Sequence, residues 1–326
     1  MRSRLLLALA KSFLVAVATG LCAAALAQVV RDEIHPFASV TLTENELLAG
    51  KKEGKPVTIA GDLRLPRGGT DRLPTVVLLH GTGGVGGWVT DWEQELNSLG
   101  IATFRVDSYT GRGLVTTFTD QDQFGRLNMV FDAWRALEVL EKHPRVDPTR
   151  IAVMGFSLGG QAALAAAVKR FQRLHGPASG REFAAYVPFY PHCNVTYRDD
   201  DVLTGHPVRI FHGTADDWAP VAPCRAYVER LKAKGADVVL TEYPGAHHVF
   251  DFPLLKPPVK IAQAQAIKGC RMEEGANNVI VNAVTREPFS WKDPCVERGA
   301  TIGYDEAALT ASRKAVKEFL TATLKP

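Results

Sequence analysis

The stretch that decides the fold is Val153-Met154-Gly155-Phe156-Ser157-Leu158-Gly159-Gly160. It follows an apolar run, Ile151 to Met154, that is typical of a short buried strand. It precedes an Ala-rich segment, Gln161 to Arg170, that is typical of a helix. A Gly-x-Ser-x-Gly core between a strand and a helix predicts a sharp turn that holds the serine hydroxyl at the end of a sheet. The pattern therefore predicts that Ser157 is a nucleophile.

The glycines around this serine support that interpretation, because a side chain at Gly155 or Gly159 would crowd the neighbouring strand or helix. Short patterns of Gly, Ser and Ala also occur in ordinary turns, so the rest of the chain must supply catalytic partners for the serine.

A serine hydroxyl is a poor nucleophile until a base takes its proton, and that base must be oriented by an acid. On a sheet of this kind the partners follow the serine in the order Asp or Glu, then His.

Two carboxylates compete for the role of the acid. The strand predicted over Val208 to Phe211 is followed by Asp216 and Asp217. We predict Asp216, because a Gly-x-x-Asp-x-x-x-Pro frame places it in the turn just after the strand, and Asp217 is the alternative.

Two histidines compete for the role of the base. The strand predicted over Leu240 to Tyr243 is followed by His247 and His248. We predict His248, with Phe250 packing beneath the loop, and His247 is the alternative.

A tetrahedral intermediate also needs hydrogen-bond donors for its oxyanion. We expect one from the backbone N–H of Leu158, directly after the nucleophile. The other should come from the loop after the apolar strand Thr75 to Leu79, where Thr82 is the first choice and Gly83 the second. A phosphate-binding loop is the competing interpretation of the glycines from His80 to Gly87, but the Gly-Lys-Ser/Thr ending is missing.

Strand and helix patterns alternate from about residue 55 to the end, which predicts an α/β fold with a mostly parallel sheet and helices on both faces. Functional residues of such sheets lie at the carboxyl ends of the strands. One segment, Pro253 to Tyr304, breaks the alternation and is rich in Pro, Gly and charge. We interpret it as an insertion, either a disulfide-tied flap near the site or a surface excursion without a role. The expected strands are 57–65, 75–79, 101–106, 151–154, 184–189, 208–211 and 238–243, and the expected helices are 91–99, 127–142, 161–170, 224–234 and 305–324.

The N-terminus has a basic start, an apolar middle and an Ala25-Leu26-Ala27 end. This pattern predicts a signal peptide over residues 1–27 and a single mature domain over residues 28–326, exported to the periplasm or secreted. A retained membrane anchor is the alternative, but Lys11 and the small residues at the end argue against a stable span. We therefore expect no stable membrane span after the signal peptide is cleaved.

Cleavage would remove Arg2, Arg4 and Lys11, so the net charge of +3 would become 0. A neutral mature chain gives no reason to expect a nucleic acid or an anionic surface as partner. The composition indicates no particular oligomeric state.

Four cysteines remain in the mature chain, and an even number in an exported protein predicts two disulfides. We expect the pairs Cys193–Cys224 and Cys270–Cys295, because the members of each pair are close in sequence and lie in a shared region. Free buried thiols are the alternative.

Taken together, these motifs resemble the α/β-hydrolase fold and, within it, the dienelactone hydrolase family. The resemblance covers roughly residues 55–252 and the last helix. Two departures favour a general ester over a dienelactone: the family's name-giving members use Cys where this chain has Ser157, and the insertion over 253–304 is longer than the compact family pattern. The matching stretches are Val77 to Gly81, Val106 to Gly113, Val146 to Gly160, His212 to Pro220 and Tyr243 to Asp251.

The resemblance also places the loop with Arg112 near the site. Arg112 is expected either to bind a substrate carboxylate or to tie its loop to Asp107. Trp218 and Trp88 are expected to line a substrate pocket, whereas Trp92, within a helix, is expected to pack in the core.

The predicted function is that of an exported serine hydrolase that cleaves a small or polymeric carboxylic ester through an acyl-enzyme, without metal or organic cofactor. The same groups would serve a peptidase, an amidase or a lactone hydrolase. A non-catalytic binding protein on a hydrolase scaffold is an alternative of another class. Lipid or polymer degradation, with residues 253–304 as a lid, is a third.

Overall fold

The computed structural model describes residues 31–325. The predicted signal peptide, residues 1–27, lies outside the described residues. Within the described range, no helix combines the length and the apolar character that crossing a membrane requires.

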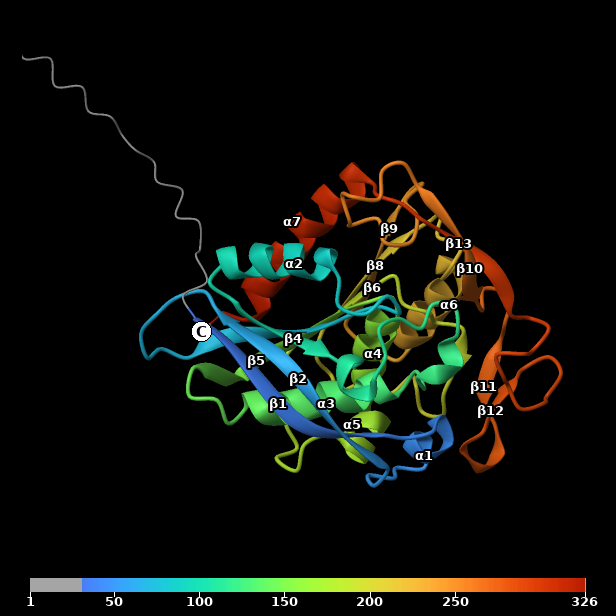
Figure 1. The fold of residues 1–326 in the computed structure, drawn as a ribbon, viewed down its shortest axis with the longest axis horizontal. Coiled ribbons are helices and arrows are strands. Elements are labelled where there is room, and N and C mark those ends of the chain that lie inside the picture. Colours follow the sequence, from blue (N-terminus) through green and yellow to red (C-terminus); the bar gives the residue numbers. More distant parts are fainter. Residues whose placement is uncertain (1–30, 326) are drawn as a thin grey trace, which may run out of the picture.

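The core of the molecule is an eight-stranded sheet with the strand order β1-β2-β4-β3-β5-β6-β8-β9 (Figure 1). β1 and β2 are antiparallel to each other, β2 is antiparallel to β4, and the remaining neighbours are parallel. The predicted mostly parallel sheet is thereby confirmed. Its strands are β1 (Arg31–Thr41), β2 (Lys55–Leu65), β3 (Leu73–Leu79), β4 (Ala102–Asp107), β5 (Val146–Phe156), β6 (Tyr186–Phe189), β8 (Val208–Gly213) and β9 (Val238–Tyr243).

Helices cover both faces of this sheet. Successive residues of a strand point to opposite faces, so Val76 and Leu78 of β3 pack with α2 and α7, whereas Val77 and Leu79 share the other core with α3, α4, α5 and α6. All seven residues of β3 are buried, as a continuous apolar run predicts. The helices are α1 (Glu44–Leu48), α2 (Gly87–Ser98), α3 (Asn128–Leu140), α4 (Leu158–Ala166), α5 (Lys169–His175), α6 (Val221–Ala233) and α7 (Glu306–Thr323), with 3-10 turns at Thr110–Arg112, Gln121–Gln123 and Ala276–Asn278.

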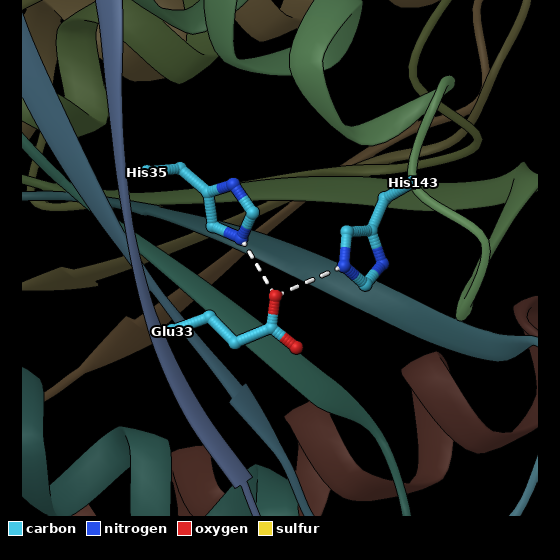
Figure 2. Close-up of side chains that lie close together, drawn as sticks. All are labelled: Glu33, His35 and His143. Carbon is cyan, nitrogen blue, oxygen red and sulfur yellow. Dashed lines mark hydrogen bonds and ion pairs between the residues drawn. The ribbon is translucent and has the colours of Figure 1, made fainter.

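The edge strand β1 was not expected from the sequence. Its eleven residues pair with β2 along their whole length, and Pro36 is tolerated because an edge strand has one side without a partner strand. Glu33 of β1 also accepts hydrogen bonds from the Nε2 atoms of His35 and His143, at 3.1 and 3.2 Å (Figure 2). These contacts fasten the edge strand to the turn that precedes β5.

The single helix predicted over 161–170 is two helices, α4 and α5. Between them the Ala167 carbonyl accepts the N–H of Thr204, and the N–H of Lys169 donates to the Val202 carbonyl. The backbone leaves the helical path here because a neighbouring segment takes over its hydrogen bonds.

The insertion over 253–304 has secondary structure of its own. β10 (Val259–Ala266) and β13 (Glu297–Ile302) form a two-stranded antiparallel sheet. β11 (Met272–Glu274) lies between β12 (Ile280–Asn282) and β7 (Val195–Thr196) in a separate three-stranded sheet. Figure 1 shows β10, β11, β12 and β13 in orange and red, beside the end of the central sheet that carries β8 and β9.

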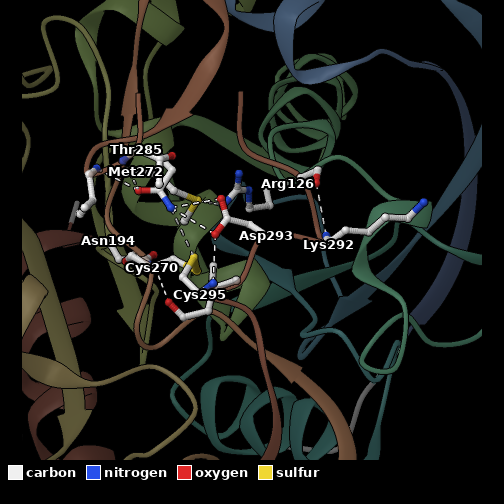
Figure 3. Close-up of a disulfide and its surroundings, with 12 residues drawn as sticks. Arg126, Asn194, Cys270, Met272, Thr285, Lys292, Asp293 and Cys295 are labelled. Carbon is white, nitrogen blue, oxygen red and sulfur yellow. Dashed lines mark hydrogen bonds between the residues drawn. A yellow bond between two sulfur atoms is a disulfide. The ribbon is translucent and has the colours of Figure 1, made fainter. Parts of the chain in front are cut away.

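Both cysteine pairs are joined as the sequence predicts. The bond between Cys193 and Cys224 links the segment after β6 to α6, and the bond between Cys270 and Cys295 closes the insertion between β10 and β13 (Figure 3). Around the second disulfide, the Cys295 N–H donates to Asp293 at 3.0 Å. The insertion is therefore a cross-linked structural unit rather than an open loop.

Candidate active site

Ser157 lies in the turn between β5 and α4, with φ of 54° and ψ of −112°. This backbone conformation is strained for a residue with a side chain, and such strain persists only where the surroundings enforce it. Here the Ser157 N–H donates to the Phe189 carbonyl at 3.0 Å, and the Ser157 carbonyl accepts the Gln161 N–H at 2.8 Å. The neighbouring strand and the first turn of α4 thus hold the serine in place.

The glycines around the turn are required by close backbone approach. A Cβ at Gly155 would lie 2.0 Å from the Gly159 carbonyl oxygen, and a Cβ at Gly159 would lie 2.3 Å from the Leu79 carbonyl oxygen. Backbone cannot move away as a flexible side chain can. The turn can therefore form only with glycine at these two positions.

Three side chains from three strand ends meet at this turn. His248, in the loop after β9, places Nε2 2.9 Å from the Ser157 Oγ and Nδ1 2.6 Å from an oxygen of Asp216, in the loop after β8. All three residues are buried, with exposed fractions of 8% for Ser157, 1% for His248 and 5% for Asp216. These two hydrogen bonds link the serine hydroxyl to the imidazole and the imidazole to the carboxylate.

The surroundings of Asp216 keep its carboxyl ionised. One carboxylate oxygen accepts the backbone N–H groups of Trp218 and Ala219, at 2.9 and 2.8 Å. Burial by itself would raise the pKa of Asp216, but the His248 and His212 rings outweigh burial and hold the pKa well below its usual value. An ionised Asp216 favours the proton on Nδ1 of His248, which leaves the Nε2 lone pair facing the serine.

Asp217 and His247, the alternative acid and base, make their hydrogen bonds to other groups and not to Ser157. Asp217 accepts hydrogen bonds from Thr301 of β13, and the His247 ring contacts the Ala215 carbonyl at 3.1 Å. The geometry thus brings Asp216 rather than Asp217, and His248 rather than His247, to the serine.

The two predicted oxyanion donors belong to residues near Ser157, since Leu158 directly follows it and Thr82 lines the same cavity. Leu158 is the first residue of α4, where an N–H has no acceptor within the helix. The loop with Thr82 is held by His80, whose Nε2 accepts the Ser108 N–H, so that Nδ1 carries the proton toward the Gly81 carbonyl at 2.7 Å. A trans peptide points its N–H opposite to its carbonyl, and His80 therefore fixes the direction of the Thr82 N–H.

A cavity of about 210 Å³ opens beside these groups. Trp88, Phe118 and Trp218 contribute aromatic walls, and the insertion contributes aliphatic side chains. Ser157, Thr82, Tyr190 and His248 supply the polar atoms, and no described lining residue is a lysine, arginine, aspartate or glutamate. The predicted places of Trp218 and Trp88 in a pocket agree with this lining.

Both roles expected for Arg112 are wrong, because its guanidinium neither lines the cavity nor contacts Asp107. It forms a two-pronged pair with Asp132 of α3, at 2.8 and 2.9 Å. Its remaining N–H groups donate to the Thr41 hydroxyl and to the carbonyls of Ser108 and Val40, so all five donors of the side chain are used. Asp107 instead accepts backbone N–H groups of its own turn.

Two residues at the site were not expected from the sequence. The Tyr190 ring packs against the His248 ring, with centroids 4.7 Å apart, and its hydroxyl donates to Asp251 at 2.7 Å. Asp251 also accepts the indole N–H of Trp92 at 2.7 Å, and its burial raises the pKa of its carboxyl. Tyr190 directly follows β6, so the rule that functional residues lie at the carboxyl ends of strands could have indicated it.

Glu33, His35 and His143 are the described residues whose ligand atoms could surround a metal ion, since these atoms lie within 4.8 Å of one another. Nδ1 of His143, however, accepts the Arg145 N–H at 3.2 Å, which leaves the ring proton on Nε2 facing Glu33. A metal-binding imidazole normally donates its other ring N–H instead. The cluster is therefore better explained by two hydrogen bonds to Glu33 than by a bound metal ion. Its His143 also precedes β5, whereas Ser157 follows that strand.

The model of the Dienelactone hydrolase family matches residues 59–270. A crystal structure of a dienelactone hydrolase-like promiscuous phosphotriesterase from metagenomic libraries is 18% identical, with a TM-score of 0.56 over 89% of this chain and 98% of that one. The structure named m3DLH is 19% identical, with a TM-score of 0.56 over 90% of this chain and 99% of that one. At these identities the likeness concerns the fold alone. None of the curated proteins compared with the chain matches it.

Proposed function

We propose that this chain, which belongs to the dienelactone hydrolase family, is an exported serine hydrolase that cleaves carboxylic esters through an acyl-enzyme. Family membership supports a hydrolase of the ester type. The observation that carries the proposal further is the pair of contacts at 2.9 and 2.6 Å that joins Ser157, His248 and Asp216 at a strained turn.

In the first half of the proposed reaction, Ser157 Oγ attacks the ester carbonyl while Nε2 of His248 takes the hydroxyl proton. Asp216 holds the ring in orientation and stabilises the imidazolium that forms. The carbonyl oxygen becomes an oxyanion, which the N–H groups of Leu158 and Thr82 bind.

The tetrahedral intermediate then collapses. The bond to the alcohol breaks, and the alcohol leaves with the proton that His248 holds. Water enters, gives a proton to His248 and attacks the acyl-enzyme. The acid leaves, and the proton returns to Ser157 Oγ, so the enzyme ends as it began.

Export is supported by the two disulfides, because such bonds persist in oxidising compartments. A purely binding role for the scaffold is disfavoured, because a binding protein has no need of an ionised acid, an imidazole and a hydroxyl in hydrogen-bonded order.

The mature chain, residues 28–326, should be labelled on Ser157 by a fluorophosphonate and should hydrolyse a short p-nitrophenyl ester. Ser157→Ala should lower kcat by roughly 10⁴-fold or more, since removal of a nucleophile leaves only the oxyanion donors and binding. Ser98→Ala, at an exposed serine of α2, is the matched control and should keep full activity. Activity that survives in Ser157→Ala, with the fold intact by circular dichroism, would remove the proposed mechanism.

A further inference from the structure

The insertion builds one wall of the cavity beside Ser157. Leu255 follows β9, Ile261 lies on β10 and Ile302 on β13, and all three line the cavity. Ile302 stands opposite Val259 in the β10–β13 pair. The pairing of the two strands therefore brings together wall residues that lie about forty positions apart in the sequence.

This wall is fixed to the loop that carries Asp216. Trp218 shares a small buried core with alanines of β10 and β13, and Ile261 and Ile302 pack against that core. The indole N–H of Trp218 donates to the Gln265 carbonyl at 3.0 Å. The insertion and the acid loop thus form one packed unit, and the wall is built into the cavity.

Apart from the groups proposed for catalysis, no described lining residue offers a cation that could pair with a carboxylate. The Trp218 indole and the Tyr190 hydroxyl donate to protein acceptors. The indole N–H of Trp88 is buried and finds no acceptor among residues 31–325, and as an uncharged donor it cannot neutralise a carboxylate. Arg112 has every donor engaged with Asp132, β1 and its own turn.

A carboxylate on the acyl chain would lose its hydration in this cavity without gaining a cation, which is strongly unfavourable. An apolar chain of equal size would gain from leaving water. The acyl group also remains bonded to Ser157 after the alcohol has left, so the lining acts on it in both halves of the reaction.

From these contacts we infer that the enzyme selects uncharged, apolar acyl groups, and that Leu255, Ile261 and Ile302 of the insertion set this selectivity. The inference rests on the proposed function, because it names the substrate class of the same site.

The test compares two activated esters of similar size, p-nitrophenyl pentanoate and mono-p-nitrophenyl succinate, on the mature protein. The expected kcat/KM for the pentanoate exceeds that for the succinate by at least about 100-fold. Ile261→Arg should shrink this ratio by about tenfold or more, because it places a cation in the wall. Leu254→Arg is the control, since this neighbour of the wall is 81% exposed and adds the same charge outside the cavity. It should leave the ratio unchanged.

The outcomes separate the inference from the function on which it rests. Equal turnover of the two esters, or a preference for the succinate, overturns the selectivity. So does a protein that a fluorophosphonate labels on Ser157 but that cleaves neither ester. If Ile261→Arg and Leu254→Arg change the ratio equally, the wall has no specific role and the change is a general effect of the added charge.

If Ile261→Arg does not fold, Ile261→Ala replaces it, and the wider cavity should then raise kcat/KM for longer apolar esters relative to the pentanoate. Failure of labelling and of all turnover instead removes the proposed function.

Discussion

The carboxylate of Asp217 accepts two hydrogen bonds from Thr301, one from its backbone N–H at 2.6 Å and one from its hydroxyl at 3.0 Å. Asp217 directly follows the proposed acid, and Thr301 belongs to β13. Two residues further on, the Gly303 N–H donates to the His248 carbonyl at 3.0 Å. One short segment of the insertion therefore fastens both the loop of the acid and the loop of the base.

Asp217→Ala should lower kcat for a p-nitrophenyl ester by about tenfold with little change in KM, because a small displacement of catalytic groups is costly while the cavity walls remain. Asp217→Asn retains an oxygen for the Thr301 N–H and an amide for the hydroxyl, so it should recover most of the rate. Steady-state kinetics on both variants provide the measurement. Equal losses in the two variants would contradict a role in positioning.

Gly159→Ala should prevent formation of the turn at Ser157, since the added Cβ would meet the Leu79 carbonyl at 2.3 Å. We expect little soluble protein, or a loss of stability of about 3 kcal/mol from overpacking against backbone. Gly87→Ala is the control, because its Cβ would make only ordinary contacts, at 3.4 Å from Phe252. Urea unfolding of both variants decides the matter, and equal stabilities would show that the close approach is unimportant.

Arg112→Ala should destabilise the fold by about 3 to 5 kcal/mol, because it leaves the buried Asp132 without its cation. The double variant Arg112→Met with Asp132→Leu should recover much of this loss. Molecules that remain folded should keep the KM of the unchanged protein. Denaturant unfolding combined with steady-state kinetics measures both effects. A raised KM without loss of stability would return Arg112 to the substrate-binding role that its sequence position indicates.

The hydrogen bonds of Glu33 should make the free energy of unfolding depend on pH. Burial alone would raise the pKa of Glu33, but His143, Arg31 and His35 together outweigh burial, so the folded pKa lies below the ordinary 4.5. A carboxyl with a depressed folded pKa stabilises the fold above its unfolded pKa, and that contribution disappears as the pH falls from about 4.5 through the folded pKa. The free energies of unfolding of the unchanged protein and of Glu33→Gln should therefore converge on acidification. Glu53→Gln, at an exposed carboxyl, serves as the control. A constant difference from pH 6 to pH 3 would contradict the assignment.

The sequence predicted the fold class and the meeting of Ser157, Asp216 and His248 because these depend on local patterns. An apolar run predicts a buried strand, and in a parallel sheet the carboxyl ends of the strands converge. The choice of Asp216 over Asp217 followed from a turn frame of a few residues. Each of these inferences needs only short-range information.

The remaining features depend on partners distant in the chain. Arg112 is engaged by Asp132 of α3 and by β1, and a single sequence gives no sign of that pairing. β10 pairs with β13 across the thirty residues that separate them, and the alternation of apolar and polar residues in β10 is interrupted where the register shifts between Ile261 and Gln265. β1 contains Pro36, which is more often the sign of a break than of a strand.

The order of the strands has a consequence for how the protein responds to heat. Ser157 follows β5, which has neighbours on both sides, whereas His248 follows β9, the last strand of the sheet. An edge strand has a partner on one side only and opens locally at lower cost than the centre. Thermal inactivation should therefore precede loss of the global fold, and the attachment of the base loop to β13 governs how far apart the two temperatures lie.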